Sequence, residues 1–592
     1  MKDATFSPVS VPAAEPRYLA YAWLMIIAFG AFRLWFSGRF PLFPEEATHW
    51  QWGRYLSWGY DDPFPLIGWL IRLSTSYFGQ NAVAVRLPGI VSSLVMSIYL
   101  LGIAARWFGG KTAFAATLML QSIWLFQFGG ILATSHVLLA AAWAGGMYHG
   151  ARAYENARWM HWLLCGFWFG IGMLSGLPMA VFVIGILLYG MTSRMHRQRL
   201  FEIRFYLGLL LGLLMVLPVL RWDARHNWSL IRNAALVVGG RETGFFHLQH
   251  FRDFFISQAS ILTPLVFLLI LMGWLHLVPR RLDTDHWVER YLWFASVPVI
   301  LLAALMSLHA PVMMAWPAAG YLGGIVLAAA RYGTGSPSGR GHDLFFAKMP
   351  WRTALGLSYL VSALVLIQVM DPIFPIPVQW DPISRGTIGW DRLGLAVGKR
   401  VPAMPDPEKT FVFALSDPVA SELAFYVPSQ PAAVSLERWL RPNTDEDWWK
   451  HADVLGWDAV GVRCDDDKDG SVARMQDVFE KIEPVEEIVF YRKAGIGQRG
   501  QGAEIRRCTL YQAYRFNGGV KAKPEENSGP DGAPVLPVPP DQAAEQGGQP
   551  SEQMGQAPGS GEPLDRSVGG PQNDAPKEGQ DGARQSGKEG PS

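Results

Sequence analysis

Residues 42–69 read LFPEEATHWQWGRYLSWGYDDPFPLIGW and lie between two apolar runs of the chain. The stretch contains four carboxylates, one histidine and four tryptophans. We interpret it as an outer loop, because the flanking runs are apolar enough to be membrane helices. A polar, aromatic and acid-rich loop that is held against a membrane is a candidate active site.

The overall composition is that of a membrane protein. Of the 592 residues, 50% are hydrophobic and only 17% are charged, and the chain contains 25 Trp and 33 Phe. Soluble domains carry about 25% charged residues, so the sequence predicts a polytopic α-helical membrane protein. The formal net charge of +1 combines basic loops with an acidic tail. The basic residues form no patch that indicates a nucleic-acid partner.

About eleven segments are long and apolar enough to cross a bilayer as helices. The first has no small-residue cleavage site behind it, so we expect a retained helix and not a removed signal peptide. The predicted spans are residues 18–36, 82–105, 113–128, 131–148, 159–174, 177–191, 205–220, 261–277, 291–308, 311–330 and 354–370.

Lys and Arg are distributed unevenly over the loops. If residues 1–17 are cytoplasmic, the basic residues fall in cytoplasmic loops, whereas the outer connections at 129–130, 175–176 and 309–310 contain no Lys or Arg. This is the bias that cytoplasmic loops show. The orientation places loops 37–81 and 221–260 on the outer face. With an odd number of spans, the C-terminal region is predicted to be outside as well.

The character of the sequence changes after the membrane domain at 18–370. Short β-like runs alternate with helical stretches around 419–426 and 472–482, which predicts a periplasmic α/β domain at 371–517. From 518 to 592 Gly, Pro, Gln, Glu, Asp and Ser dominate, so we expect a disordered tail. Cys464 and Cys508 allow either one bridge in an extracytoplasmic domain or two free thiols.

Glu45 and Glu46 are the candidate catalytic carboxylates. A carboxylate can deprotonate an attacking hydroxyl or amine, and aromatic ring faces can hold the apolar side of a sugar, so this loop suits sugar chemistry. The alternatives are solvated loop charges and an interfacial belt of Trp. The candidate sugar-binding residues are His49, Trp52, Tyr60, Asp62 and His136.

Arginines on the outer face are the natural partners of a phosphate, because a guanidinium can bind it bidentately. Arg54, Arg86 and Arg225 are the candidates, although an arginine at a helix end can also simply extend its charge to the interface. A divalent metal is conceivable, with Glu46, His247 and His250 as weak candidate ligands, but the first loop has no HExxH spacing.

The stretch Phe43–Leu70, followed by AVRLPGIVSSL, resembles the bacterial relatives of the dolichyl-phosphate-mannose protein mannosyltransferases, which include the aminoarabinose transferases of lipid A and have the GT-C fold. In that family an acidic pair precedes an aromatic stretch, a GY-x-DHPPL-like turn and an RLP. Further matches in the same order are LPVLRWDARHNW at 217–228, Gln258 with Thr263 and Pro264, Trp316 and Pro317 with Tyr321, and ELAFY at 422–426.

The resemblance implies an inverting glycosyltransferase of the bacterial inner membrane, with its active site facing the periplasm. Its donor would be a polyprenyl-phosphate sugar, and its acceptor would be lipid A, a lipopolysaccharide core, another glycolipid or a protein. The resemblance places the catalytic base at Glu45, with Glu46 beside it, and the phosphate-binding arginine at Arg86.

The sequence departs from the family pattern at four places. Pro63 with Phe64, His136 and Gly176 stand where relatives usually have His-Pro, an acid and a lysine, and Glu45 replaces the usual Asp. The longer Glu45 side chain moves a catalytic oxygen beyond the usual geometric tolerance. Two other functions therefore stay open: a catalytically silent GT-C scaffold that binds polyprenyl phosphate or a pathway partner, and a transporter or lipid flippase.

Overall fold

The protein is described here from a computed structural model. The predicted site residue Asp62 lies outside the described residues, as does the predicted tail from 519 onward. The residues that the structure describes are 15–60, 64–228, 232, 247–276, 286–334, 350–436, 451–465, 471–495 and 502–518.

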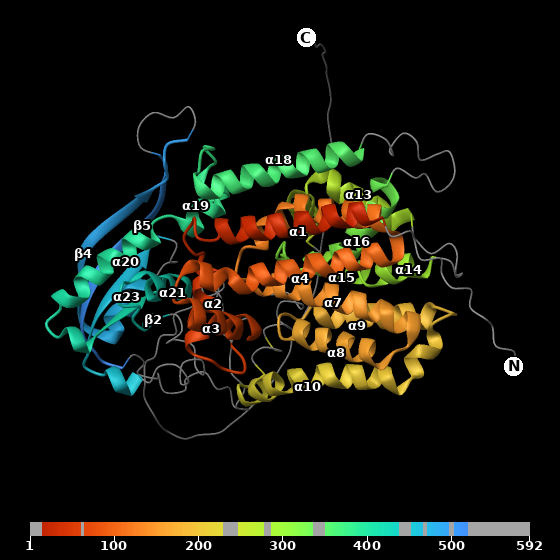
Figure 1. Cartoon of the computed structure of the whole chain (residues 1–592). Coiled ribbons are helices and arrows are strands. Elements are labelled where there is room, and N and C mark those ends of the chain that lie inside the picture. The colour runs from red at the N-terminus through yellow and green to blue at the C-terminus, as the bar shows by residue number, and fades with distance from the viewer. Residues whose placement is uncertain are drawn as a thin grey trace, which may run out of the picture. The chain divides into compact units, whose positions relative to one another are not determined.

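Helices dominate the chain up to Met370, and each of the predicted spans contains helix (Figure 1). The helices of this part are α1 Pro16–Phe36, α2 Pro44–Arg54, α3 Leu66–Phe78, α4 Ala82–Phe108, α5 Gly110–Ser122, α6 Trp124–Gly129, α7 Ser135–Asn156, α8 Trp159–Met173, α9 Met179–Thr192, α10 Ile203–Arg225, α12 Leu248–Leu262, α13 Pro264–His276, α14 Trp287–Phe294, α15 Val297–Met306, α16 Tyr321–Ala328 and α18 Pro350–Met370.

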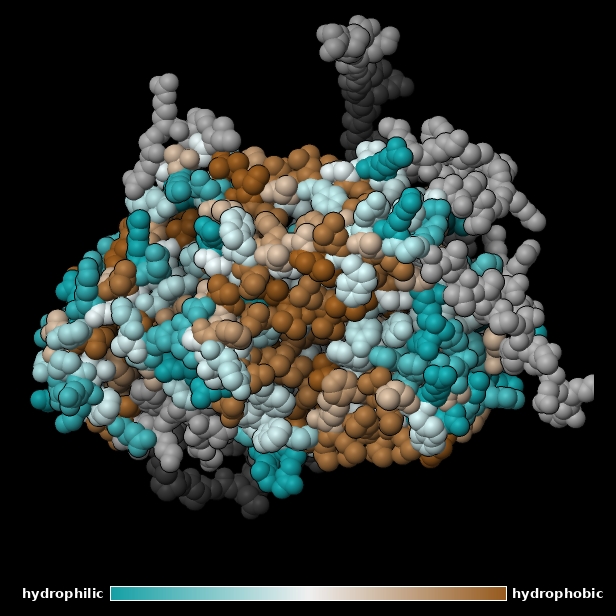
Figure 2. Space-filling model, viewed as in Figure 1, coloured by the Kyte–Doolittle hydropathy of each residue, from teal (hydrophilic) through white to brown (hydrophobic). Residues whose placement is uncertain are grey.

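Five helical segments of the described residues are long and apolar enough to cross a membrane, and six if the bent pair α12–α13 is one span. Other predicted spans are shorter or broken: α8 has 15 residues and α9 has 14, while α5 and α6 separate at Ile123. The predicted count of eleven spans stays a prediction. Figure 2 shows apolar side chains gathered over the helices and hydrophilic ones over the sheet domain, as expected for a bilayer belt.

Helix breaks in the membrane domain have their backbone groups satisfied by neighbours, as a bilayer requires. At the break after α5, the carbonyl of Ser122 accepts hydrogen bonds from Ser358 and Ser362 of α18 at 2.8 and 2.6 Å. The 106° bend between α12 and α13 lies at Thr263, whose φ is 65°. Beside this bend the Tyr321 hydroxyl donates to Gln258 at 2.9 Å, which joins two of the matched family motifs.

A five-stranded sheet follows the helical part, in the order β2-β1-β3-β5-β4. β1 pairs in parallel with β2 and β3, and β5 pairs antiparallel with β3 and β4. The strands are β1 Thr410–Ala414, β2 Ala433–Ser435, β3 Asp458–Cys464, β4 Phe479–Tyr491 and β5 Glu504–Phe516, and the helices are α19 Pro382–Thr387, α20 Trp390–Arg400, α21 Asp417–Tyr426 and α23 Ser471–Val478.

The two faces of the sheet pack against different partners, as the alternation of β1 requires. Phe411 and Phe413 face a core shared with α23, whereas Val412 and Ala414 face a core shared with α20, α21 and α2. The helix expected at 472–482 is too long. It ends at Val478, because Phe479 begins β4, packs into the α23 core and pairs with β5.

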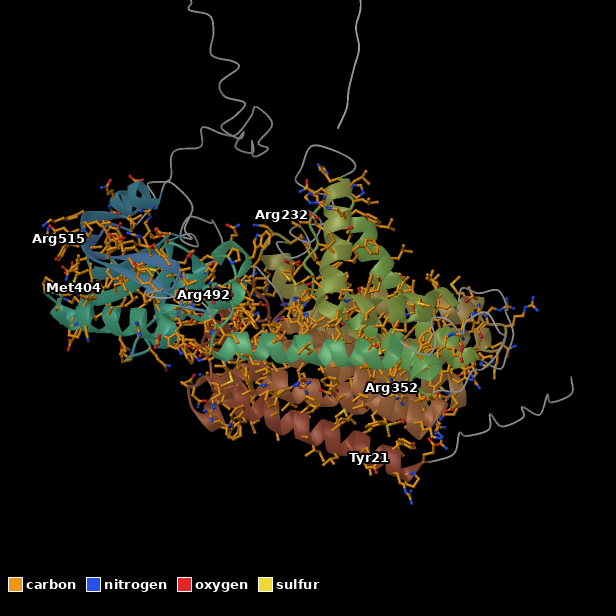
Figure 3. All side chains as sticks on the ribbon, turned by 90° about the horizontal axis from the view of Figure 1, so that it is seen from above. Tyr21, Arg232, Arg352, Met404, Arg492 and Arg515 are labelled. Carbon is orange, nitrogen blue, oxygen red and sulfur yellow. A yellow bond between two sulfur atoms is a disulfide. The ribbon has the colours of Figure 1, made fainter. Side chains whose placement is uncertain are left out.

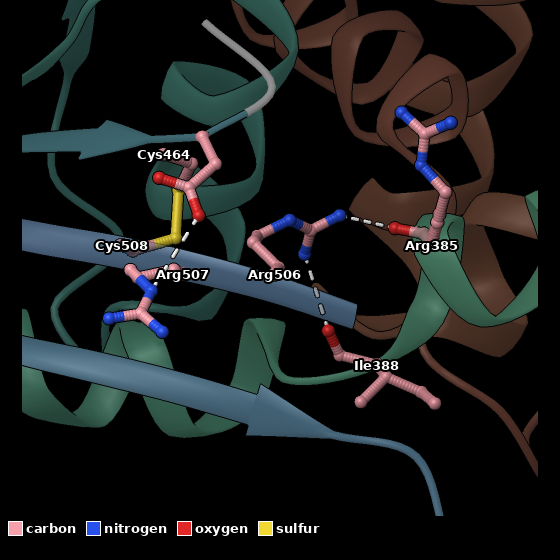
Figure 4. Close-up of a disulfide and its surroundings, with 7 residues drawn as sticks. Arg385, Ile388, Cys464, Arg506, Arg507 and Cys508 are labelled. Atoms are coloured by element: carbon pink, nitrogen blue, oxygen red, sulfur yellow. Dashed lines mark hydrogen bonds and ion pairs between the residues drawn. A yellow bond between two sulfur atoms is a disulfide. The ribbon is translucent and has the colours of Figure 1, made fainter. Parts of the chain in front are cut away.

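Cys464 of β3 and Cys508 of β5 are directly opposite each other in the antiparallel ladder and form a disulfide (Figure 4). The sequence left open a disulfide or two free thiols, and the structure contains the disulfide. A buried ion pair lies on the side of the sheet domain that faces the helices, where Arg492 binds Asp381 at 2.8 Å (Figure 3).

Candidate active site

Helix α2 presents the two adjacent glutamates in its first turn. Pro44 occupies the first helical position, which suits its fixed φ. The Glu46 carboxylate then reaches back to accept the backbone N–H of Phe43 at 3.0 Å, as in a capping box. Successive helical residues point about 100° apart, since a turn takes 3.6 residues. Accordingly Glu46 is completely buried, whereas Glu45 is exposed.

Arg86 of α4 uses all of its guanidinium N–H groups in hydrogen bonds to this turn and to the loop before it. Its Nε and one Nη donate to both oxygens of the Glu46 carboxylate, at 2.6–3.2 Å, and neither side chain is exposed. The remaining N–H groups donate to the carbonyls of Ser37 at 2.6 Å, Phe40 at 2.9 Å and Pro41 at 2.8 Å. A guanidinium has five N–H groups, so the predicted phosphate contact of Arg86 finds no donor in this arrangement.

The same glutamate fixes the segment that leads into α7. Glu46 accepts the backbone N–H of Ala133 at 3.0 Å, and His49 lies 2.8 Å from the Ala133 carbonyl through Nδ1. Since a carbonyl only accepts, Nδ1 of His49 carries the proton of this bond. Three residues later, the half-buried His136 lies in the first turn of α7 and interacts electrostatically with Glu45 and His49. The structure therefore brings Glu45, His49 and His136 together.

The predicted aromatic platform serves mainly to hold the loop. Trp52 and Tyr60 stack with ring centroids 4.6 Å apart, and His49 packs against the Trp52 ring at 4.8 Å. Both aromatic residues are buried, so their ring faces are covered by protein and not open to a sugar. The Tyr60 hydroxyl lies within hydrogen-bond distance of Trp52 O and of the Ser57 N–H, and burial raises the pKa of Tyr60 to about 12.

The other two candidate phosphate ligands lie at different places. Arg54, in the last turn of α2, donates to the carbonyl of Pro431 at 3.1 Å and so contacts the sheet domain. Arg225 is exposed at the C-terminal end of α10. That end of α10 lies against the first outer loop, because a Cβ on Gly59 would be only 2.4 Å from the ring of Trp222.

The weak metal candidates do not converge. Glu46 is occupied by Arg86, while His247 and His250 pack together at the start of α12, with ring centroids 5.3 Å apart. Within the described part of the chain, no three His, Cys, Asp or Glu side chains are placed to hold a metal ion.

The sheet domain supplies contacts that the sequence did not assign. Tyr426 of α21 accepts the backbone N–H of Leu42 at 2.7 Å, and Ser421 donates to Gln51 of α2 at 2.8 Å. Glu422 of the same helix is completely buried and interacts electrostatically with Glu46. The matched ELAFY motif was the only signal in the sequence for this contact, because the residues are more than 360 positions apart.

The sequence is similar to a family of membrane glycosyltransferases and to two characterised relatives. A family model described as dolichyl-phosphate-mannose-protein mannosyltransferase matches residues 61–222. The lipid A galacturonosyltransferase RgtD of Rhizobium johnstonii is 24% identical over 343 residues, which are 56% of this chain and 66% of that protein. The undecaprenyl phosphate-alpha-4-amino-4-deoxy-L-arabinose arabinosyl transferase of Pseudomonas aeruginosa is 27% identical over 327 residues, 48% of this chain and 53% of that protein. The matches thus span less than two thirds of either relative.

The fold is also that of a solved structure. The crystal structure of ArnT from Cupriavidus metallidurans bound to undecaprenyl phosphate superposes with a TM-score of 0.54 at 13% identity, over 86% of this chain and 99% of that one. This likeness covers both the membrane helices and the sheet domain in one architecture. The chain therefore has the fold of ArnT, and over residues 61–222 its sequence is similar to the dolichyl-phosphate-mannose-protein mannosyltransferase family.

Proposed function

We propose that this protein transfers a sugar from a polyprenyl-phosphate donor to an envelope glycolipid at the outer face of the bacterial inner membrane. The proposal is supported by the different environments of the two adjacent carboxylates, Glu45 and Glu46. Glu46 is locked in a buried ion pair, and the exposed Glu45 is thereby held beside His136 and His49. A rigidly placed carboxylate at the edge of a membrane domain can act as a general base.

In the proposed reaction Glu45 accepts the proton of the acceptor hydroxyl. As that proton leaves, the hydroxyl oxygen forms a bond to the anomeric carbon of the sugar. The bond from that carbon to the phosphate oxygen breaks on the opposite side, and its electron pair stays on the phosphate. The products are an inverted glycoside and polyprenyl phosphate. His136 lies close enough to Glu45 to orient the carboxylate by its charge or by a hydrogen bond.

Cationic groups are needed where the phosphate leaves, because negative charge builds up there. We propose Arg225 for this role, since it is exposed at the end of α10 that lies against the first outer loop. Arg54 is a second candidate, although one of its N–H groups already donates to Pro431. Arg86 instead positions Glu46.

The names of the two relatives suggest the substrates. The first relative is a lipid A galacturonosyltransferase. The second is an arabinosyl transferase named for undecaprenyl phosphate aminoarabinose. We propose lipid A as the acceptor and an undecaprenyl-phosphate-linked galacturonic acid or aminoarabinose as the donor. A lipopolysaccharide core or a protein would replace lipid A as the acceptor if transfer occurred only when that molecule was offered in its place.

We propose the orientation with a cytoplasmic N-terminus and with the sheet domain at 371–517 in the periplasm. Two observations support it. Basic residues are absent from the short outer connections, and the Cys464–Cys508 disulfide suits an oxidising compartment. The active-site loop 37–81 packs against the sheet domain, so both lie on the same side of the membrane.

Transfer by the purified full-length protein in nanodiscs tests the proposal. The donors are undecaprenyl-phosphate galacturonic acid and undecaprenyl-phosphate aminoarabinose, and the acceptor is lipid A. Glu45→Gln is expected to lower turnover roughly 10²–10⁴-fold with unchanged folding, the range typical of general bases. If neither donor supports transfer although the intact protein binds undecaprenyl phosphate, the silent-scaffold function replaces this one.

A further inference from the structure

A buried acid of the sheet domain lies behind the candidate catalytic helix. Glu422 of α21 is completely buried, and among the described residues neither of its carboxyl oxygens has a hydrogen-bond partner. Burying a carboxylate without partners costs several kcal/mol, whereas the neutral acid is tolerated far better. The electrostatic surroundings of Glu422 therefore decide its charge.

The charged and titratable groups that face Glu422 come from four elements. Arg506 of β5, Arg86 of α4, Glu46 of α2 and Tyr426 on its own helix interact with it electrostatically. Arg86 is already committed to Glu46 and to three backbone carbonyls. The negative Glu46 repels a second carboxylate.

Arg506, the other cation, is turned toward the backbone. It donates to the carbonyls of Ile388, at 3.2 Å, and Arg385 (Figure 4). Its guanidinium also lies over the ring of Trp390, 3.8 Å from the ring centroid. Burial consequently outweighs these cations and raises the pKa of Glu422 well above its usual range.

Helix α21 holds the helix that carries the active site. Ser421, next to Glu422, donates to Gln51 of α2, and Phe425 packs edge-on against Trp50 at 5.0 Å. A negative charge on Glu422 would be repelled by Glu46 and would compete for Arg86, the residue that fixes the first turn of α2. The contact between α21 and α2 therefore depends on Glu422 being uncharged.

We propose that Glu422 is a positioning residue that must stay a neutral carboxylic acid for the sheet domain to hold α2 and the Glu45 base in place. The consequence is a loss of order at the active site in alkaline solution. This inference rests on the proposed function for its effect on turnover, but its effect on stability is independent of any sugar chemistry.

The sign of the pH dependence follows from the raised pKa. The folded protein keeps the proton of Glu422 more tightly than the unfolded chain, whose glutamate has the ordinary value of 4.5. The stabilisation is complete below that value and is lost as the pH rises toward the pKa of the folded state. Above the folded pKa the neutral fraction falls about tenfold for each pH unit.

Glu422→Gln imitates the neutral acid, and Glu408→Gln is the matched control, because Glu408 is exposed in the same domain. Thermal unfolding of the full-length protein in nanodiscs is followed at about pH 6 and about pH 9, without substrate. We expect the midpoints of wild type and Glu408→Gln to fall on going to the higher pH. The midpoint of Glu422→Gln should fall clearly less.

Turnover with the undecaprenyl-phosphate donors is measured across the same range. Wild-type kcat is expected to decline at alkaline pH while KM changes little, and Glu422→Gln should keep its kcat to a higher pH. Equal pH profiles for wild type and Glu422→Gln would overturn the inference. So would a loss of stability at about pH 6 in both Glu422→Gln and Glu422→Met, because the fold would then need the ionised carboxylate. Absence of transfer with intact pH-dependent unfolding would reject the proposed function alone.

Discussion

The substitution Glu46→Gln separates the two adjacent glutamates by their physical roles. The structure predicts that Glu46 is a structural partner of Arg86 and not the catalytic base. The neutral amide keeps the size of the side chain but removes the only negative charge that is hydrogen-bonded to Arg86 among the described residues. The guanidinium would then be left buried with backbone carbonyls as its remaining acceptors.

The expected cost is large because both partners are completely buried. Removing one member of a buried ion pair typically costs about 3–5 kcal/mol, since the other charge stays uncompensated in a low-dielectric environment. Glu46 also accepts the backbone N–H groups of Phe43 and Ala133. The amide oxygen of glutamine can still accept one of these two N–H groups. We therefore add nothing for the lost backbone hydrogen bonds and place the loss in free energy of unfolding at roughly 3–5 kcal/mol.

The assay is unfolding of the purified full-length protein in detergent, followed by tryptophan fluorescence, with Glu45→Gln as the matched control. Glu45 is exposed, so its substitution should change stability by less than about 0.5 kcal/mol. Glu46→Gln should unfold at a clearly lower temperature or denaturant concentration. A Glu46→Gln protein that is as stable as wild type but inactive would refute the assignment and make Glu46 the base.

Three further predictions concern the surroundings of α2. Tyr426→Phe removes the hydroxyl that accepts the backbone N–H of Leu42 in the first loop, so it should lower the free energy of unfolding by about 1–3 kcal/mol and also lower kcat. Unchanged values of both would show that the contact is dispensable. Cys508→Ser breaks the bridge to Cys464, and the loss of about 2–5 kcal/mol should appear as increased protease cleavage of the sheet domain; a reductant should increase cleavage of wild type but not of the variant. Gly59→Ala would clash with the Trp222 ring, so turnover should fall, whereas Gly356→Ala, with open space around it, should be neutral in the same assay.

Local patterns in the sequence predicted much of the fold. Each apolar run that was predicted as a span contains helix, and each β-like run overlaps one of the five strands of the sheet. The start of β4 was missed because residues 472–482 mix apolar and charged residues at a spacing that suits a helix, and only pairing with β5 makes Phe479 a strand residue. At the bend, Pro264 follows Thr263 and predicts a break between the two helices, but nothing in the sequence predicts the positive φ of Thr263.

The candidate site was predicted only in part. The sequence brought Glu45, Glu46 and Arg86 into one hypothesis but could not show which carboxylate the arginine holds. A signal was nevertheless present, because Pro44 at the first helical position makes Glu46 the residue that can reach back to the helix start. The contacts of α21 with the first loop could not be derived from local patterns, since they join residues 370 and 384 positions apart.

The burial of Glu46 also bears on the longer side chain at position 45. The first turn of α2 is fixed by Arg86, whose bonds reach three carbonyls of the preceding loop as well as Glu46, so the backbone cannot retreat to offset an extra methylene. The carboxylate of Glu45 must therefore reach further toward the substrate or fold back toward His136, with which it interacts electrostatically. A histidine there, in place of the family's usual acid, offers a hydrogen-bond partner where a second carboxylate would repel. We propose that the two departures from the family pattern compensate each other through this electrostatic interaction, which favours a working catalytic site with altered geometry over a lost one.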